Sequence, residues 1–307
     1  MKKISFIIPV FRNEGTVALT YQKISVLFNE SLASYDYEII FIDDGSDDGS
    51  YNEILKLKYH DSHVVAIKLT RNFGQLSAIL AGYNEAKGDA VINISADLQD
   101  PIDLVIEMIK RWEADSEVVV GYRSDREDSF SASFFSKLAY GIIRLSNPKV
   151  PEGGFDFVLI GRRALSLFLS IEGRHRFFQG DILWGGFATS FIPYVRKKRQ
   201  VGKSGYNFWK RLKILIDWIL DSSYLPIRFM SFLGVTIAFF GCVYAVTIIV
   251  SWFFGGTPFS GWAPLMIAVL LIGGLLMLML GVIGEYVWRI YDEIRKKPNY
   301  VIDEIIR

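Results

Sequence analysis

Short apolar runs alternate with amphipathic stretches along about the first 130 residues of the chain. The runs are continuously apolar, which is typical of strands buried on both faces of a parallel sheet. The stretches between them repeat apolar positions at the spacing of helices. This alternation predicts an α/β fold in which helices cover both faces of a mostly parallel, Rossmann-like sheet. The expected strands are Ile4–Val10, Glu38–Asp43, Val64–Leu69, Ala90–Ser95 and Glu117–Gly121, and helical patterns cover Thr16–Phe28, Gln75–Ala86 and Ile102–Trp112.

A different pattern follows further along, where no Asp, Glu, Lys or Arg occurs from Phe229 to Gly284. Turn residues at Gly255–Pro264 divide this segment into two apolar stretches. Each stretch could form a helix that crosses the hydrocarbon core of a membrane, which needs about 20 residues. Two buried core helices are the alternative, but soluble cores rarely need two such uninterrupted runs. We therefore expect a transmembrane hairpin, with helices at about 229–254 and 265–286.

Basic residues around the hairpin predict its orientation. Lys and Arg precede the first span and follow the second, whereas the loop between the spans has neither. By the positive-inside rule, both ends of the chain face the cytoplasm. The stretch Asn207–Ser223 combines an apolar face with basic neighbours, which is typical of a helix lying in the lipid headgroup layer. Ser133–Asn147 shows the same pattern more weakly, and a helix packed on the globular part explains it equally well.

These patterns divide the chain into four parts. We expect a cytoplasmic globular domain at 1–204, a juxtamembrane interfacial helix at 205–228, two transmembrane helices within 229–288, and a cytoplasmic tail at 289–307. The formal net charge is only +1, so the composition makes no case for a nucleic-acid partner. Cys242 is the single cysteine, which excludes a disulfide within one chain.

Acidic clusters follow two of the expected strands. Asp43 and Asp44 close the second strand, and the sequence SADLQD, Ser95–Asp100, closes the fourth. Ligands of parallel α/β sheets bind beyond the carboxyl ends of the strands. A calcium loop of the EF-hand type needs Glu at its twelfth position, and Ile54 or Leu55 stands there. The glycine-rich nucleotide loops are also absent, so a nucleotide would be held by carboxylates and a metal. Asp47 and Asp48 are assigned to a solvated turn.

The ordered set of motifs resembles the family 2 glycosyltransferases of the GT-A fold. The motifs are IIPVFRNE, IDDGS, RNFGQ, SADLQDP and VGYR. The later segment KKRQVGKSGY, the two apolar spans and the tail GEYVWRIYDEIRKKPNY narrow the resemblance to polyprenyl-phosphate glycosyltransferases. That group includes bactoprenol glucosyltransferases and dolichol-phosphate mannose synthases. The resemblance covers nearly the whole chain.

The resemblance implies a membrane enzyme that moves a hexose from a nucleotide sugar to undecaprenyl or another polyprenyl phosphate. Glucose from UDP-glucose is the best guess, with Mg²⁺ or Mn²⁺ as cofactor and inversion by a single displacement. The implied location is the bacterial inner membrane, in modification of O-antigen or another cell-envelope glycan. Aminoarabinose, GlcNAc or mannose donors are alternatives, and so is a non-catalytic nucleotide-sugar scaffold. Processive synthases fit less well, because their Q-x-x-R-W signature is missing. A homo-oligomer is possible, since Gly273 and Gly274 would permit helix association.

The resemblance also implies residue roles on the donor side. Asp97 would bind the metal with help from Gln99, although Ser95 stands where the family's D-x-D-type motif commonly has its first Asp. The metal then depends on diphosphate oxygens and water, which is normal for magnesium. Asp97, Asp100 and Arg123 are the catalytic candidates. The nucleotide sugar would be bound by Pro9, Phe11, Glu14, Asp43, Asp44, Asp97 and Gln99.

On the acceptor side, a phosphate monoester is mostly a dianion at neutral pH, so its attack needs no strong base. Asp100 is a candidate base by position, although capping of a helix that starts at Pro101 is favoured. Asp156 either faces the sugar or makes structural hydrogen bonds. The sequence Arg174–Asp181 predicts the start of a helix, and a zinc role for His175 is not expected. The residues expected to bind the acceptor phosphate are Arg123, Arg126, Arg199, Lys203 and Ser204.

Overall fold

The computed structural model describes residues 1–125, 141, 144, 148–151, 154–174, 176–195, 225–254 and 263–307. The chain divides into two compact units, and each is described separately below. The first comprises Met1–Lys213 and Pro298–Arg307, and the second comprises Ile214–Lys297. The C-terminal ten residues thus fold with the N-terminal domain.

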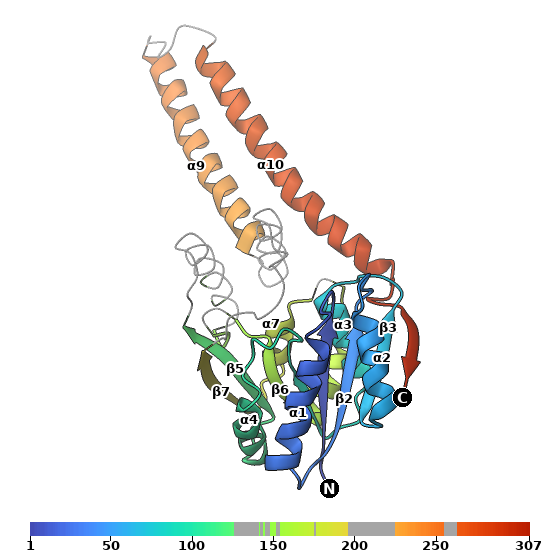
Figure 1. The fold of residues 1–307 in the computed structure, drawn as a ribbon. Coiled ribbons are helices and arrows are strands. Elements are labelled where there is room, and N and C mark those ends of the chain that lie inside the picture. Colours follow the sequence, from blue (N-terminus) through green and yellow to red (C-terminus); the bar gives the residue numbers. More distant parts are fainter. Residues whose placement is uncertain are drawn as a thin grey trace. The chain divides into compact units, whose positions relative to one another are not determined.

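An eight-stranded sheet forms the centre of the first unit in the part that the structure describes, with the order β7-β5-β6-β4-β1-β2-β3-β8 (Figure 1). Strands β1 to β4 pair in parallel, β6 is antiparallel to both β4 and β5, and β8 is antiparallel to β3. The expected mostly parallel sheet is confirmed. The strands are β1 Lys3–Val10, β2 Asp36–Asp43, β3 Val64–Leu69, β4 Ala90–Asn93, β5 Val118–Asp125, β6 Phe157–Gly161, β7 Thr189–Val195 and β8 Ile302–Ile306.

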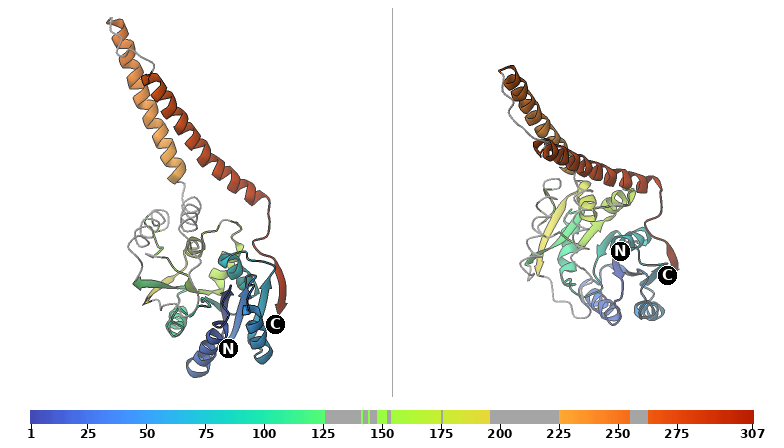
Figure 2. Two further views of the ribbon diagram at one scale, coloured as in Figure 1. Left: turned by 45° about the horizontal axis from the view of Figure 1, so that its top comes forward. Right: turned by 90° about the horizontal axis from the view of Figure 1, so that it is seen from above.

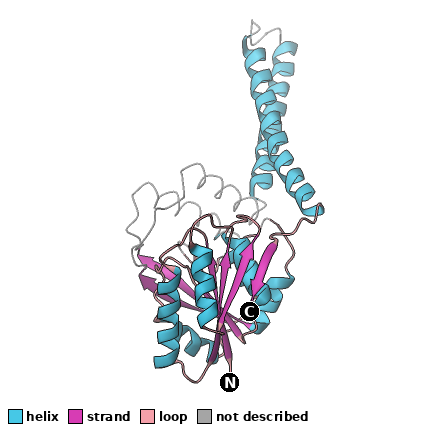
Figure 3. Ribbon diagram, turned by 45° about the vertical axis from the view of Figure 1, so that its right-hand side comes forward, coloured by secondary structure: helices cyan, strands magenta, loops and turns pink. Residues whose placement is uncertain are grey.

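Helices lie on both faces of this sheet (Figure 3). On one face, α1 (Val17–Ser31), α2 (Ser50–His60) and α4 (Leu104–Glu113) contribute side chains to a core with Phe6 and Phe41. In α1 the buried residues recur every three or four positions, which gives one apolar stripe. The other helices of this unit with described bounds are α3 Gln75–Glu85, α6 Arg162–Ser170 and α7 Phe178–Trp184. Packing on the second face is close, because a Cβ on Gly82 of α3 would come within 2.7 Å of the Ile7 and Ile42 side chains.

Several element boundaries differ from the sequence-based expectation by one to four residues. Strand β4 ends at Asn93, two residues before the expected Ser95, because the chain turns there into the 95–100 loop. Strand β5 continues to Asp125, beyond the expected Gly121, because β7 pairs with it in parallel over this stretch. Helix α4 begins at Leu104, later than the expected Ile102.

The C-terminal strand β8 covers the edge of the sheet beside β3. The carbonyl oxygen of Val301 accepts a hydrogen bond from the Thr70 amide at 3.1 Å, and Tyr51 donates to Glu304 at 2.8 Å. Asn84 donates to the hydroxyl oxygen of Tyr300 at 3.0 Å. The sequence analysis assigned 289–307 to a cytoplasmic tail and did not foresee a strand within it. An edge strand that is paired in this way no longer offers its backbone groups to another chain.

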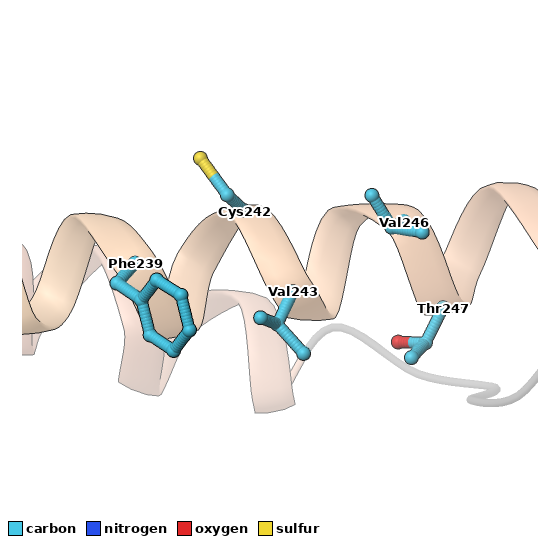
Figure 4. Close-up of a pocket in the computed structure, with 5 residues that line it drawn as sticks. All are labelled: Phe239, Cys242, Val243, Val246 and Thr247. Carbon is cyan, nitrogen blue, oxygen red and sulfur yellow. The ribbon is translucent and has the colours of Figure 1, made fainter.

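The second unit contains two long helices, α9 (Leu225–Phe253) and α10 (Ala263–Ile294), which run side by side (Figure 2). Ile227–Ser251 and Leu265–Ile294 are long and apolar enough to cross a membrane, and most of their residues are exposed. A shallow hollow on α9 is lined by apolar side chains and Thr247 (Figure 4). Its lining carries no carboxylate or basic group, so it offers nothing for the chemistry discussed below.

Deleting Ile302–Arg307 should destabilise the first unit, because β3 loses its hydrogen-bonded neighbour and Glu304 its contact with Tyr51. Backbone hydrogen bonds contribute about 1 kcal/mol each, so we expect the thermal midpoint of the detergent-solubilised protein to fall by roughly 5 °C or more. Asp303→Asn is the control, since it removes only a 3.7 Å ion pair between exposed groups. An unchanged midpoint in the deletion variant would contradict the assignment of β8 to the sheet.

Candidate functional site

The carboxyl ends of β1, β2, β3 and β4 meet at one edge of the sheet, because these neighbouring strands are parallel (Figure 1). Four loops leave the strands at this edge, and they contain most of the residues singled out from the sequence. They are residues 11–16 after β1, 44–49 after β2, 70–74 after β3 and 94–103 after β4. In open α/β sheets this edge is where ligands bind.

Asp44 ties the loop after β2 to the loop after β3. Its carboxylate is 3% exposed and accepts hydrogen bonds from the amides of Phe73, at 2.7 Å, and Gly74, at 2.9 Å. Burial raises the pKa of Asp44 above its usual value, and these two amide bonds oppose that shift. The two loops also touch directly, since a Cβ on Gly45 would lie 2.5 Å from the carbonyl carbon of Arg71. The neighbouring Asp43 is fully buried and accepts a hydrogen bond from the Ser46 amide at 3.2 Å.

The loop after β1 is held by the loop after β2 through exposed charges. The Arg12 guanidinium donates to both carboxylate oxygens of Asp47, at 2.7 and 2.6 Å. Arg12 has a φ of 54°, a left-handed conformation that is uncommon for a residue with a side chain. Glu14 accepts from the Gly49 amide at 3.1 Å. Asp47 was assigned to a solvated turn. It is exposed, and its turn also holds the loop after β1 through Arg12.

Two residues of the predicted donor site stand at the start of this loop. Pro9 lies in β1, paired with Ile42 of β2. Phe11 follows the strand and is 41% exposed, and the Arg12 guanidinium lies over its ring, 5.3 Å from the centroid. Asp43 and Asp44 lie at the carboxyl end of β2, next to β1, so these residues lie at the same edge of the sheet.

The 95–100 loop brings two carboxylates together through one hydroxyl group. Ser95 Oγ lies 2.8 Å from Asp97 Oδ1 and 2.7 Å from Asp100 Oδ2. Serine has a single hydroxyl hydrogen, so it donates to one of the two carboxylates at a time. The Gln99 amide donates to Asp97 at 3.2 Å. Leu98 between them has a φ of 60°, and such strained residues gather at functional sites.

Asp100 is fully engaged by hydrogen-bond donors. The Ser95 amide donates to Oδ2 at 3.1 Å, and the Tyr194 hydroxyl donates to Oδ1 at 3.0 Å. Helix α4 begins at Leu104, after an N-terminal cap position at Asp103. The expectation that Asp100 caps a helix starting at Pro101 is therefore wrong. The carboxylate instead holds the start of its own loop.

Arg123 lies on β5 beside these groups. Its guanidinium donates to Asp156 at 3.2 Å, and its register partner on β7 is Tyr194. Burial disfavours the charged form of Arg123, but Asp156 and Tyr194 outweigh it and hold the pKa above the usual value. Asn93 donates to the Asp156 carbonyl at 2.7 Å and thereby fixes the turn before β6.

Sequence reasoning missed Tyr194 and Asn93. Tyr194 stands in a short strand with no acidic or glycine-rich motif, and Asn93 reads as the last residue of an apolar strand. Asp156 makes the structural hydrogen bonds that were one of its two expected roles. The helix expected from Arg174–Asp181 is present as α7, which begins at Phe178. Arg126, Arg199, Lys203, Ser204, His175 and the stretches 133–147 and 207–223 lie wholly or mainly outside the described residues.

The Asp97 carboxylate of the 95–100 loop suits a metal ion that takes most of its ligands from substrate and water. Among the described residues, no group of three or more His, Cys, Asp or Glu side chains is arranged to hold a metal. Asp97, which is 5% exposed, supplies one carboxylate, while Asp100 is held by the Ser95 amide and the Tyr194 hydroxyl. Magnesium commonly uses one or two carboxylates and completes its shell with water and substrate phosphates. The site fits that mode of binding, with the protein side provided by the 95–100 loop.

Known proteins resemble the chain in sequence and in fold. The family profile described as "Glycosyl transferase family 2" matches residues 5–166. The prophage bactoprenol glucosyl transferase homolog of Escherichia coli (strain K12) is 35% identical over 308 residues, which cover 99% of each chain. The bactoprenol glucosyl transferase of Shigella phage SfII is 35% identical over 305 residues, covering 98% of this chain and 97% of the relative.

A solved structure has a similar fold. The glucosyl-3-phosphoglycerate synthase from Mycobacterium tuberculosis, in complex with Mn²⁺, UDP-glucose and phosphoglyceric acid, aligns with a TM-score of 0.53. The alignment covers 72% of this chain and 78% of that one, at 17% sequence identity. At this identity the likeness shows the GT-A fold alone.

The contact between the loops after β2 and β3 can be tested at two glycines with left-handed backbones. Gly45 (φ 70°) and Gly15 (φ 83°) would both be strained by a Cβ, by about 1–2 kcal/mol. Only at Gly45 would the Cβ also collide with the next loop, whereas it meets nothing within 4 Å at Gly15. We expect Gly45→Ala to be destabilised by at least about 1 kcal/mol more than Gly15→Ala in denaturant unfolding. Equal losses would contradict the tight packing of these loops.

Proposed function

This chain belongs to glycosyl transferase family 2, and from that premise we propose that it transfers glucose from UDP-glucose to a polyprenyl phosphate at a membrane surface. One observation carries the proposal: hydrogen bonds lead from Asp97 through Ser95 and Asp100 to Tyr194, which is paired with Arg123 across β7 and β5. A carboxylate that suits a metal ion and diphosphate thus stands near a half-buried guanidinium that suits a phosphate. The bactoprenol glucosyl transferases among its relatives support the choice of sugar and acceptor.

The donor nucleoside is assigned to the loops after β1, β2 and β3. Phe11 offers an exposed ring, and Pro9 and Glu14 flank it in the same segment. The carboxylates of Asp43 and Asp44 hold backbone amides and so shape the pocket walls. Such preorganised loops reduce the ordering cost of binding a nucleotide.

The diphosphate is assigned to the 95–100 loop. Asp97 would hold Mg²⁺ or Mn²⁺, with Gln99 beside it, together with the donor's phosphate oxygens. When bound, the cation neutralises the charge that develops on the departing UDP. Asp100 is not needed as a base in this proposal, because the acceptor phosphate is mostly a dianion with no proton to lose. It positions Ser95 and through it the Asp97 carboxylate.

The acceptor phosphate is assigned to Arg123, together with Arg126, Arg199, Lys203 and Ser204. One phosphate oxygen attacks the anomeric carbon as the bond from that carbon to the diphosphate breaks. UDP leaves from the opposite face, so an α-linked donor gives a β-linked glucosyl phosphate lipid. The phosphate dianion has no proton to lose, and the task of Arg123 is to orient it and hold its charge.

Helices α9 and α10 are assigned to anchoring the enzyme in the bacterial inner membrane, with the catalytic domain and both termini in the cytoplasm. Their length and exposed apolar side chains support this role. In the division expected from the sequence, with boundaries after residues 204, 228 and 288, the last part is the tail at 289–307. Strand β8 lies in this tail and pairs with β3.

Turnover tests the proposal directly. Membranes containing the protein, undecaprenyl phosphate and radiolabelled UDP-glucose should yield a labelled lipid that organic solvent extracts. Asp97→Asn should lower that rate by about 100-fold or more, because it removes the carboxylate expected at the diphosphate. Asp103→Asn is the matched control, since this exposed residue lies in the same loop and makes no side-chain cap. Labelled lipid from another nucleotide sugar but not from UDP-glucose would contradict the assigned donor.

The small number of protein ligands expected for the metal leads to a second prediction, about metal binding. Mn²⁺ should bind weakly to the protein alone and at least about 10-fold more tightly once UDP is present, because the diphosphate completes the shell. Titration of Mn²⁺ by electron paramagnetic resonance, with and without UDP, measures this difference. Equally tight binding in both titrations would show that the protein supplies a full ligand set by itself.

A further inference from the structure

A chain of polar contacts crosses the first unit from the 95–100 loop to β5, and Tyr194 is its middle member. On one side, the Tyr194 hydroxyl donates to Asp100 Oδ1 at 3.0 Å. On the other side, its neighbour across the β5–β7 pairing is Arg123, and the hydroxyl helps to raise the pKa of that guanidinium. Asp100 continues the chain to Ser95, which lies 2.8 Å from the Asp97 carboxylate. One phenol therefore connects the two halves of the proposed active site.

The surroundings of Tyr194 fix both its position and its protonation state. In the parallel pairing of β5 and β7, Tyr194 stands directly beside Arg123, so their side chains share one face of the sheet. Its ring packs edge-on against Phe157, with 5.9 Å between the ring centroids. The residue is 6% exposed, and burial raises the pKa of its hydroxyl well above the usual value. The phenol thus stays protonated and donates to Asp100 at every physiological pH.

We propose that Tyr194 is a positioning residue, which fixes the Arg123 guanidinium relative to Asp100 and the 95–100 loop. The inference deepens the proposed function and rests on it, because it assigns Tyr194 a part in orienting the acceptor phosphate. It does not make Tyr194 a catalytic residue, since the phenol acts through Arg123.

The two sides of the contact would respond differently to its loss. Asp100 keeps two contacts with Ser95, through the amide at 3.1 Å and the hydroxyl at 2.7 Å. Arg123 keeps its 3.2 Å contact with Asp156, whose side chain is 51% exposed. The Nε atom of Arg123 is buried and has no hydrogen-bond partner among the described residues. Loss of the phenol hydroxyl therefore leaves the metal side in place and leaves the guanidinium to the half-exposed Asp156 carboxylate, which fixes its orientation less well. The effect should fall on the acceptor.

Tyr194→Phe tests this asymmetry, because it removes one hydroxyl and keeps the ring against Phe157. We expect kcat/KM for polyprenyl phosphate to fall between about 10- and 100-fold, as misplacement of an orienting group does. The dissociation constant for UDP with Mn²⁺ should change by less than about 3-fold, which also verifies that the variant is folded. A purely structural role would weaken both together, and that result would overturn the inference.

Tyr83→Phe is the matched control. Tyr83 is also a buried tyrosine, but its hydroxyl has no hydrogen-bond partner in the described part of the chain. Its removal should leave both acceptor use and UDP binding unchanged. If Tyr194→Phe behaves like Tyr83→Phe, the positioning role is wrong while the proposed function stands.

A double-mutant cycle with Arg123→Gln identifies the partner through which Tyr194 acts. If the guanidinium is already misplaced in Tyr194→Phe, then Arg123→Gln should cost at least about 5-fold less in that background than in the wild type. Independent, multiplicative losses would overturn the inference. A wild-type protein that binds UDP with Mn²⁺ but transfers no sugar to polyprenyl phosphate would overturn the proposed function, and this inference with it.

Discussion

Four neighbouring strands, β4, β1, β2 and β3, run parallel, and their carboxyl ends therefore meet at one edge of the sheet. Every loop of the donor side begins at that edge. The strands are held in register by burial on both faces, so the starting point of each loop is set by the core. Because the register is fixed, Asp44 reaches the amides after β3, and the two carboxylates of the 95–100 loop share Ser95.

The buried carboxylates of this site accept hydrogen bonds from the protein's own backbone and side chains. Burying an ionised group is costly unless hydrogen-bond donors surround it. Asp43 and Asp44 receive backbone amides, and Asp100 receives an amide and a phenol. These hydrogen bonds hold the loops in place without any ligand.

The side of the sheet beyond β4 is built differently. There β6 runs antiparallel to its neighbours and β7 pairs in parallel with β5, which brings Tyr194 beside Arg123. Tyr194 and Arg123 are neighbours through strand pairing, and Tyr194 contacts Asp100 through its side chain. The partners are about 70 to 95 positions apart in the chain. At the opposite edge, β8 joins the sheet from the far end of the sequence, after both long apolar helices. The first unit is thus completed only when the whole chain is present.

The sequence by itself determined the α/β order, the first five strands to within a few residues, the two apolar helices and the loops in which site residues gather. Those features are local: periodicity, strand composition and short motifs are written in consecutive residues. Tertiary structure alone decided that β8 closes an edge, that Asp100 holds Ser95 rather than a helix, and that Tyr194 joins Asp100 to Arg123. Contacts of this kind depend on which strands become neighbours, and the sheet order that sets this is not written in any single stretch of sequence.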